Sequence, residues 1–147
     1  FFGKEVLHDV DEAAFYRHIA EVRKVTGDRA VLRAIHFFNE NRRVNSQVRA
    51  LKDGDFDAFL HLVNASGMAS WTLLQNVTPA GYIQKQDMAF TIALCQQLLE
   101  GEGAVRIHGG GFAGTALAFV PNDRFARFKT CVEHVLGEGH CHKLTIQ

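Results

Sequence analysis

Four glycines within six residues, in the run GGGFAG from Gly109 to Gly114, restrict what the second half of this chain can fold into. The short apolar runs on either side, AVRIH and TALAFV, predict two strands, and the glycines form the connection between them. Glycine permits positive φ and a close approach of other groups because it has no Cβ. A simple hairpin needs only one or two glycines. The loop is therefore predicted to present backbone N–H groups to an anion or another ligand, with a tight turn or bulge as the alternative.

The residues after the loop exclude two familiar glycine motifs. Gly109, Gly111 and Gly114 formally satisfy G-x-G-x-x-G, but the dinucleotide-binding motif requires a helix immediately afterwards, and here a strand-like run ends at Pro121. A P-loop requires Lys-Ser or Lys-Thr after the glycines, and neither is present.

The rest of the chain has mainly helical periodicity, with an apolar residue every three or four positions. A last run, HCHKLTIQ, alternates like a strand. The pattern predicts an α+β fold, a ferredoxin-like split β-α-β sandwich with extra N-terminal helices. The predicted helices cover residues 11–25, 28–51, 55–63, 86–99 and 122–135.

Three further expectations concern these helices. Asp28 and Asp55 are suitable N-caps, and an apolar stripe that includes Val48 and Leu51 is expected to face inward on the second helix. The polar middle of that helix, from His36 to Arg43, could bind a polar ligand, face solvent or contact a neighbouring domain.

A long segment without charge lies between the third and fourth predicted helices. Residues 58–84 contain no Asp, Glu, Lys or Arg, but they include Trp71, Pro79 and Gly81. Such a segment is predicted to be a broken helix or a long loop that packs against something or lines a pocket.

Composition excludes several classes of protein. Sixteen Lys and Arg residues balance sixteen Asp and Glu residues, so we expect no nucleic-acid partner, because such proteins need a basic patch. No apolar run approaches the roughly 20 residues of a membrane-spanning helix, and we expect no membrane partner. The three cysteines, Cys95, Cys131 and Cys141, are widely spaced and odd in number. They predict free thiols and a cytoplasmic protein.

Metal and nucleophile chemistry have little support in the sequence. In His140-Cys141-His142, a strand would place the histidines on one face and the cysteine on the other, so the three do not easily chelate one ion. A site would need His108 beside the two histidines, and nothing in the sequence indicates that. No base or helix N-terminus is evident to activate Cys141. We therefore predict no metal site and no catalytic residue within this chain.

At the glycine loop the sequence resembles a known family. The run from Arg106 to Pro121 resembles the C-terminal glycine motif of galactokinases, which are GHMP small-molecule kinases. A second block is similar to the family's ordered motifs, over residues 35–42, 50–56 and 62–66 (IHFFNENR, ALKDGDF and LVNAS). The resemblance extends from about Asp28 to Pro121.

This resemblance implies that residues 1–147 form the C-terminal domain of a GHMP kinase. The catalytic N-terminal domain of the same polypeptide would be its partner, and would carry the phosphate loop, the catalytic Asp and most sugar contacts. The full-length enzyme would use ATP and Mg²⁺ to phosphorylate a sugar. The chain alone would be inactive and bind neither cofactor. That it begins at Phe1, without an initiator Met, agrees with a piece of a longer protein.

The resemblance also implies which residues approach the ligands. The glycine loop, made up of Gly109, Gly110, Gly111, Phe112, Ala113 and Gly114, would lie beside the nucleotide or the substrate. Ser66, Gly67 and His108 could line the substrate pocket. Gly67, His108 and Ala113 depart from the His, Thr and Gly usual in the family, which leaves the identity of the sugar open.

Two other interpretations remain from the sequence. The chain could be a free-standing ferredoxin-like module that binds a small anion or metabolite for regulation. It could also come from a degenerate kinase that kept the fold and lost the chemistry.

Overall fold

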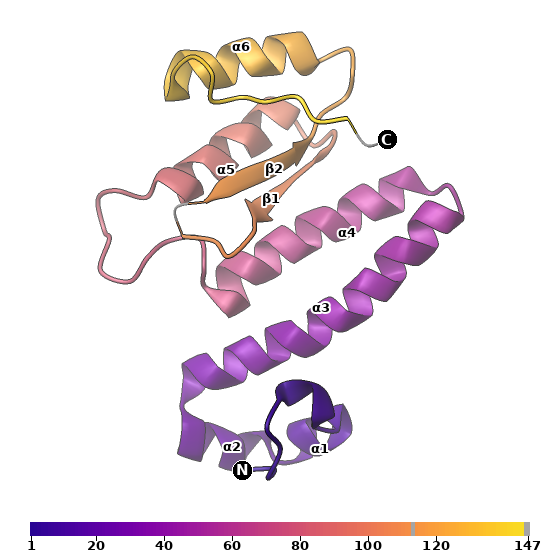
Figure 1. The fold of residues 1–147 in the computed structure, drawn as a ribbon, viewed down its shortest axis with the longest axis vertical. Coiled ribbons are helices and arrows are strands. Elements are labelled where there is room, and N and C mark those ends of the chain that lie inside the picture. The colour runs from indigo at the N-terminus through magenta and orange to yellow at the C-terminus, as the bar shows by residue number, and fades with distance from the viewer. Residues whose placement is uncertain (113, 146–147) are drawn as a thin grey trace.

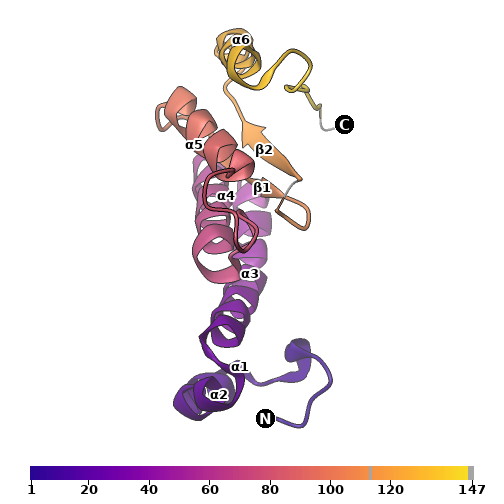
Figure 2. The same ribbon diagram turned by 90° about the vertical axis from the view of Figure 1, so that its left-hand side faces the viewer.

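The computed structural model describes residues 1–112 and 114–145, and it confirms an α+β fold. A short antiparallel hairpin lies among helices, with the N-terminal helices at one end of the molecule and α6 at the other (Figures 1 and 2). The elements run in the order η1 (Leu7–Asp9), α1 (Glu12–Arg17), α2 (Ile19–Thr26), α3 (Asp28–Lys52), α4 (Phe56–Ala69), η2 (Ser70–Leu74), α5 (Asp87–Leu99), β1 (Ala104–His108), β2 (Thr115–Phe119) and α6 (Phe125–Leu136). No helix among the described residues is both long and apolar enough to cross a membrane.

The N-terminal region packs through an aromatic and aliphatic cluster. Phe15, Val22, Val31 and Phe38 are buried together, which joins α1 and α2 to the long helix α3. The single helix predicted over residues 11–25 is instead two helices, because His18 leaves helical geometry at φ −107° and ψ 17°.

The helix α3 matches its predicted extent, but part of its predicted packing is wrong. Val48 is 46% exposed and Leu51 is 53% exposed, so neither belongs to the inward face, although Ala50 between them is buried. The predicted cap at Asp28 is also wrong, since Gly27 is the N-cap. Asp28 instead forms an ion pair with Arg23.

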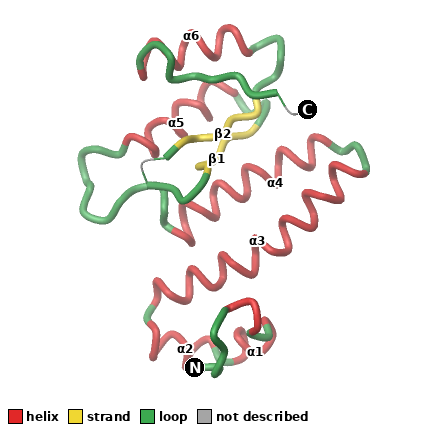
Figure 3. The backbone as a smooth tube through the Cα atoms, viewed as in Figure 1, coloured by secondary structure: helices red, strands yellow, loops and turns green. Residues whose placement is uncertain are grey.

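The charge-free segment combines most of α4, a wider helical turn and a long loop, and the helix predicted over residues 55–63 continues to Ala69. Asp55 caps α4 by accepting a hydrogen bond from the Ala58 N–H at 2.9 Å. The helix then widens into the π-helical turn η2 and stops at Gln75, which has the left-handed φ of +57°. A long loop leads from there to α5 (Figure 3).

The hairpin lies between α4 and α5. Its strands pair with Ala104 opposite Phe119 and His108 opposite Thr115. The helix α4 contacts β1, while α5 contacts both strands. The central core is formed by side chains of α5, β1 and α6 together with Val77. The glycine loop therefore extends from a strand that is fixed on both sides.

The ferredoxin-like sandwich is not reproduced in the part of the chain that the structure describes. There the sheet has two strands, and residues 140–145 form no strand, so the strand predicted there is wrong over those positions. The segment runs as coil beside α6 (Figure 1), where Cys141 packs against the central core. Alternating side chains alone cannot make a strand without an edge to pair with. Ile146, in the same predicted run, lies outside the described residues.

The buried thiols give the fold a dependence on alkaline pH. Burial raises the pKa of the Cys95 thiol to about 11 and also raises the pKa of Cys141. An unfolded thiol ionises near pH 9, so between pH 9 and 11 the unfolded chain releases protons that the folded chain retains. Stability should therefore fall as pH rises through this window. Urea unfolding at pH 8 to 11 should show a smaller decrease in Cys95→Ala than in the wild type, and equal decreases would contradict this origin.

Candidate functional site: the glycine loop

The glycine loop is attached through its middle to one residue of the charge-free segment. The Phe112 N–H donates a hydrogen bond to the backbone oxygen of Asn76 at 2.6 Å. The Asn76 side-chain Nδ2 donates to the Gly110 oxygen at 3.3 Å. Residues far apart in the chain are thereby joined where η2 ends.

Only glycine fits at the centre of this attachment. Gly111 has φ +87°, and a Cβ there would lie 2.5 Å from Asn76 Nδ2 and 2.8 Å from its Cγ. Phe112 also has a positive φ, +62°, which is unfavourable for a bulky side chain, and it is 39% exposed. Strain of this kind persists only where surrounding contacts impose it, and it concentrates at functional sites.

The start of the loop, next to the end of β1, is open by contrast. A Cβ at Gly109 or Gly110 would meet no atom within 4 Å. At Gly114 a Cβ would make ordinary contact with the His108 oxygen at 3.4 Å. Ala113 lies outside the described residues. The loop is thus fixed where it faces Asn76, and the space where side chains at positions 109 and 110 would lie is open.

The three predicted pocket residues are placed differently from one another. His108 is exposed at the end of β1, directly before the loop. Ser66 is fully buried on α4, and its hydroxyl donates to Glu40 Oε2 at 2.6 Å. Gly67 faces β1 and allows the helix to approach the strand. Two hollows on the molecule are lined by other residues, and a role of this trio in a substrate pocket stays a prediction.

The close approach at Gly67 predicts a stability effect. A Cβ there would lie 3.0 Å from both the Val105 oxygen and the Arg106 Cβ. The variant Gly67→Ala should therefore separate α4 from β1 and destabilise the protein by about 1–3 kcal/mol, the usual range for overpacking. Gly110→Ala is the matched control, because its Cβ would meet open space. Chemical denaturation measures both, and equal midpoints would contradict the contact.

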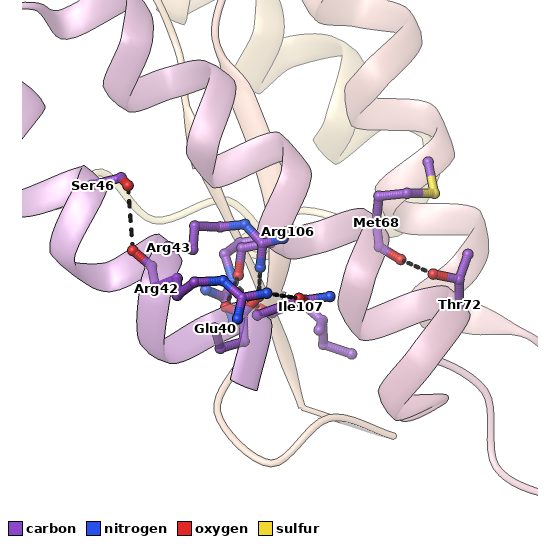
Figure 4. Close-up of polar contacts among 10 residues, drawn as sticks. Glu40, Arg42, Arg43, Ser46, Met68, Thr72, Arg106 and Ile107 are labelled. Carbon is purple, nitrogen blue, oxygen red and sulfur yellow. Dashed lines mark hydrogen bonds and ion pairs between the residues drawn. The ribbon is translucent and has the colours of Figure 1, made fainter. Parts of the chain in front are cut away.

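Charged side chains from α3 and β1 form a cluster behind β1, on the side of this strand that faces α3 (Figure 4). Glu40 pairs with Arg43, and their side chains are only 21% and 15% exposed. Burial and the neighbouring charge of Arg106 lower the pKa of Arg43, and burial lowers the pKa of Arg106. Arg106 also donates through Nε to the Ile107 oxygen at 3.0 Å. The cluster links α3 and α4 to the strand that carries the glycine loop.

Sequence reasoning located the loop but missed what holds it. The polar middle of α3 was compatible with solvent, a ligand or another domain, and only the fold shows Glu40 bound to Ser66 and Arg43. At Asn76 the sequence offers only the glycosylation pattern Asn-Val-Thr, which gives no indication of a contact with the loop. The one available signal was that a charge-free segment should pack against something. Among the described residues, no three His, Cys, Asp or Glu side chains are grouped so that they could hold a metal ion.

The sequence and the fold of this chain were compared with those of known proteins. No model of a protein family matches the chain. The galactokinases of Actinobacillus succinogenes and Mannheimia succiniciproducens are 31% and 32% identical to it over 124 residues. These matches cover 84% of the chain and 30% of each relative, so the chain spans about a third of the length of the relatives it matches.

A solved structure agrees with the sequence matches. Lactococcus lactis galactokinase, crystallised in complex with galactose, superposes with a TM-score of 0.65 and 26% identity over 91% of this chain and 33% of that one. The fold and these matches show that the chain is GHMP-kinase-like, as its glycine loop and second motif block predicted. More specifically, it is galactokinase-like over most of its length.

Proposed function

We propose that this chain is the C-terminal domain of a galactokinase-like sugar kinase, which transfers the γ-phosphoryl group of ATP to a sugar hydroxyl. The similarity to galactokinases over 84% of the chain but only 30% of their length supports both parts of this proposal. The remaining parts would come from the N-terminal kinase domain of the same polypeptide, including the phosphate loop and the catalytic base.

The observation that carries the proposal is that one part of the glycine loop is held by the protein while another part is open. The middle of the loop is fixed by Asn76, whereas Gly109 and Gly110 have open space at their Cβ positions and lack side chains that would block a ligand. Backbone groups presented in this way fit a phosphate or a sugar hydroxyl. Gly109–Phe112 and Gly114 contain no carboxylate, so they do not fit a magnesium ligand set, and Mg²⁺ ligands would come from the other domain.

The contribution of this chain to catalysis would be to position the ligand. In phosphoryl transfer the enzyme contributes mainly alignment and charge stabilisation, and bound Mg·ATP supplies the phosphoryl group and much of the charge neutralisation. The loop would close the site from the C-terminal side, hold its backbone against the ligand and exclude water. A loop kept rigid by Asn76 and by a strand packed on α4 and α5 suits that role.

The sugar is galactose or a close analogue in this proposal. The Lactococcus lactis structure holds galactose. Here Gly67 packs against β1, and His108 is exposed beside the loop. His108 is therefore the residue through which this chain would alter the sugar preference.

The test compares the full-length protein with the isolated chain. Each is incubated with Mg·ATP and a panel of sugars that includes galactose, and sugar phosphate is measured directly. The full-length protein should phosphorylate at least one sugar, while the chain alone should give none. Phosphorylation by the chain alone would contradict the division of labour. A full-length protein inactive on every sugar would overturn the proposed activity and favour a degenerate kinase.

A further inference from the structure

We propose that Asn76 is a positioning residue, whose side-chain amide holds the glycine loop in the conformation that receives the ligand. This inference rests on the proposed function and deepens it. Asn76 lies in the charge-free segment, outside both sequence blocks that resemble the kinase family.

Asn76 contacts the loop on both sides of Gly111. Its backbone oxygen accepts from Phe112, and its Nδ2 donates to Gly110. Any residue at this position could make the first bond, but the second needs a side-chain donor of this length. Aspartate has no such donor. Glutamine is longer by one methylene, and at Gly111 even a Cβ would overlap the Asn76 amide.

The support beneath Asn76 is rigid. The N–H groups of Gln75 and Asn76 both donate to the Ser70 oxygen, at 2.8 and 3.4 Å. The next residue, Val77, is 1% exposed and belongs to the central core. Asn76 is therefore fixed at both ends, and its amide transmits that fixed position to the loop.

Stability alone does not account for an asparagine here. Asn76 is only 6% exposed. Among the described residues, no group donates a hydrogen bond to its buried Oδ1. A buried acceptor without a partner destabilises a fold, so an apolar residue would suit a purely structural position better. The amide is best explained by the geometry that it imposes on Gly110, Gly111 and Phe112.

The test uses Asn76→Ala and Asn76→Asp in the full-length protein. Both variants remove the donor, and aspartate keeps the shape of the side chain. We expect kcat to fall about 10–100-fold, the range for a misplaced positioning group, with a small change in Tm. Asn64→Ala is the matched control. The Asn64 amide donates to Gly103 and accepts from Val105, both at 3.1 Å, at the opposite end of the same strand. It should lower Tm and leave kcat near the wild-type value.

A second readout keeps this test separate from the proposed function. Wild-type sugar phosphorylation tests the function, whereas amide hydrogen exchange tests the loop without any substrate. Exchange at Phe112 should accelerate in both Asn76 variants and stay unchanged in Asn64→Ala. Unchanged exchange at Phe112 in the Asn76 variants would overturn the inference, even in an active kinase. Wild-type kcat in an active Asn76→Ala enzyme would overturn it as well.

Discussion

In the full-length protein, Gly110→Val is expected to reduce kcat by about 100-fold or more, the scale of losses on misplacing a reacting group. The reason is the open side of the loop. A Cβ at Gly110 meets no protein atom within 4 Å, and the φ of Gly110 lies outside the left-handed region, so the backbone accepts a side chain at this position. Its isopropyl group would instead occupy the space into which the ligand must come. Steady-state sugar phosphorylation and thermal unfolding of the same preparation measure the two effects.

The comparison with Gly111→Ala separates blocking the ligand from breaking the loop. At Gly111 the new methyl group would overlap Asn76, so this variant should lose both activity and stability. Gly110→Val should lose activity with Tm within about 2 °C of the wild type, as for a surface substitution. Wild-type kcat and KM in Gly110→Val would remove the loop from the active site.

The second large effect is a loss of stability in Glu40→Ala. Without this carboxylate, the partly buried guanidinium of Arg43 loses its ion-pair partner and keeps the like charge of Arg106 nearby, and the Ser66 hydroxyl loses its acceptor. Breaking a buried ion pair from one side costs about 3 kcal/mol. In a domain of this size that corresponds to a Tm lower by about 10 °C.

A surface pair provides the control for Glu40. Glu102 accepts a hydrogen bond from Arg124 at 2.9 Å, but the Glu102 side chain is 61% exposed. Glu102→Ala should therefore change stability by less than about 1 kcal/mol. If Glu40→Ala unfolds at the same temperature as Glu102→Ala, the cluster behind β1 does not stabilise the fold.

The elements that the sequence predicts well are those specified by local chemistry. Asp55 caps a helix through its own side chain, and the runs on either side of the glycines pair as expected. The glycine loop was recognisable because four glycines exceed what a turn requires. Helix α3 was recognisable over its length because most of its residues favour one conformation.

The features that were missed depend on contacts between distant residues. The break at His18 and the exposure of Val48 depend on what packs against each helix, which periodicity does not report. The coil over residues 140–145 alternates like a strand but finds no edge. The bonds from Asn76 to Gly110 and from Ser66 to Glu40 join residues more than twenty positions apart, so local sequence does not reveal them.

The most direct test of the central claim, that the glycine loop faces the ligands of a sugar kinase, is an NMR titration. The full-length protein is labelled with ¹⁵N-glycine, and the signals of Gly109 and Gly110 are assigned by single substitution. On addition of a non-hydrolysable ATP analogue with Mg²⁺, and then of the sugar substrate, these two signals should move at saturation. Gly137 and Gly139, at the end of α6, serve as the reference and should stay in place. Unmoved loop signals in a protein that phosphorylates the sugar would contradict the claim.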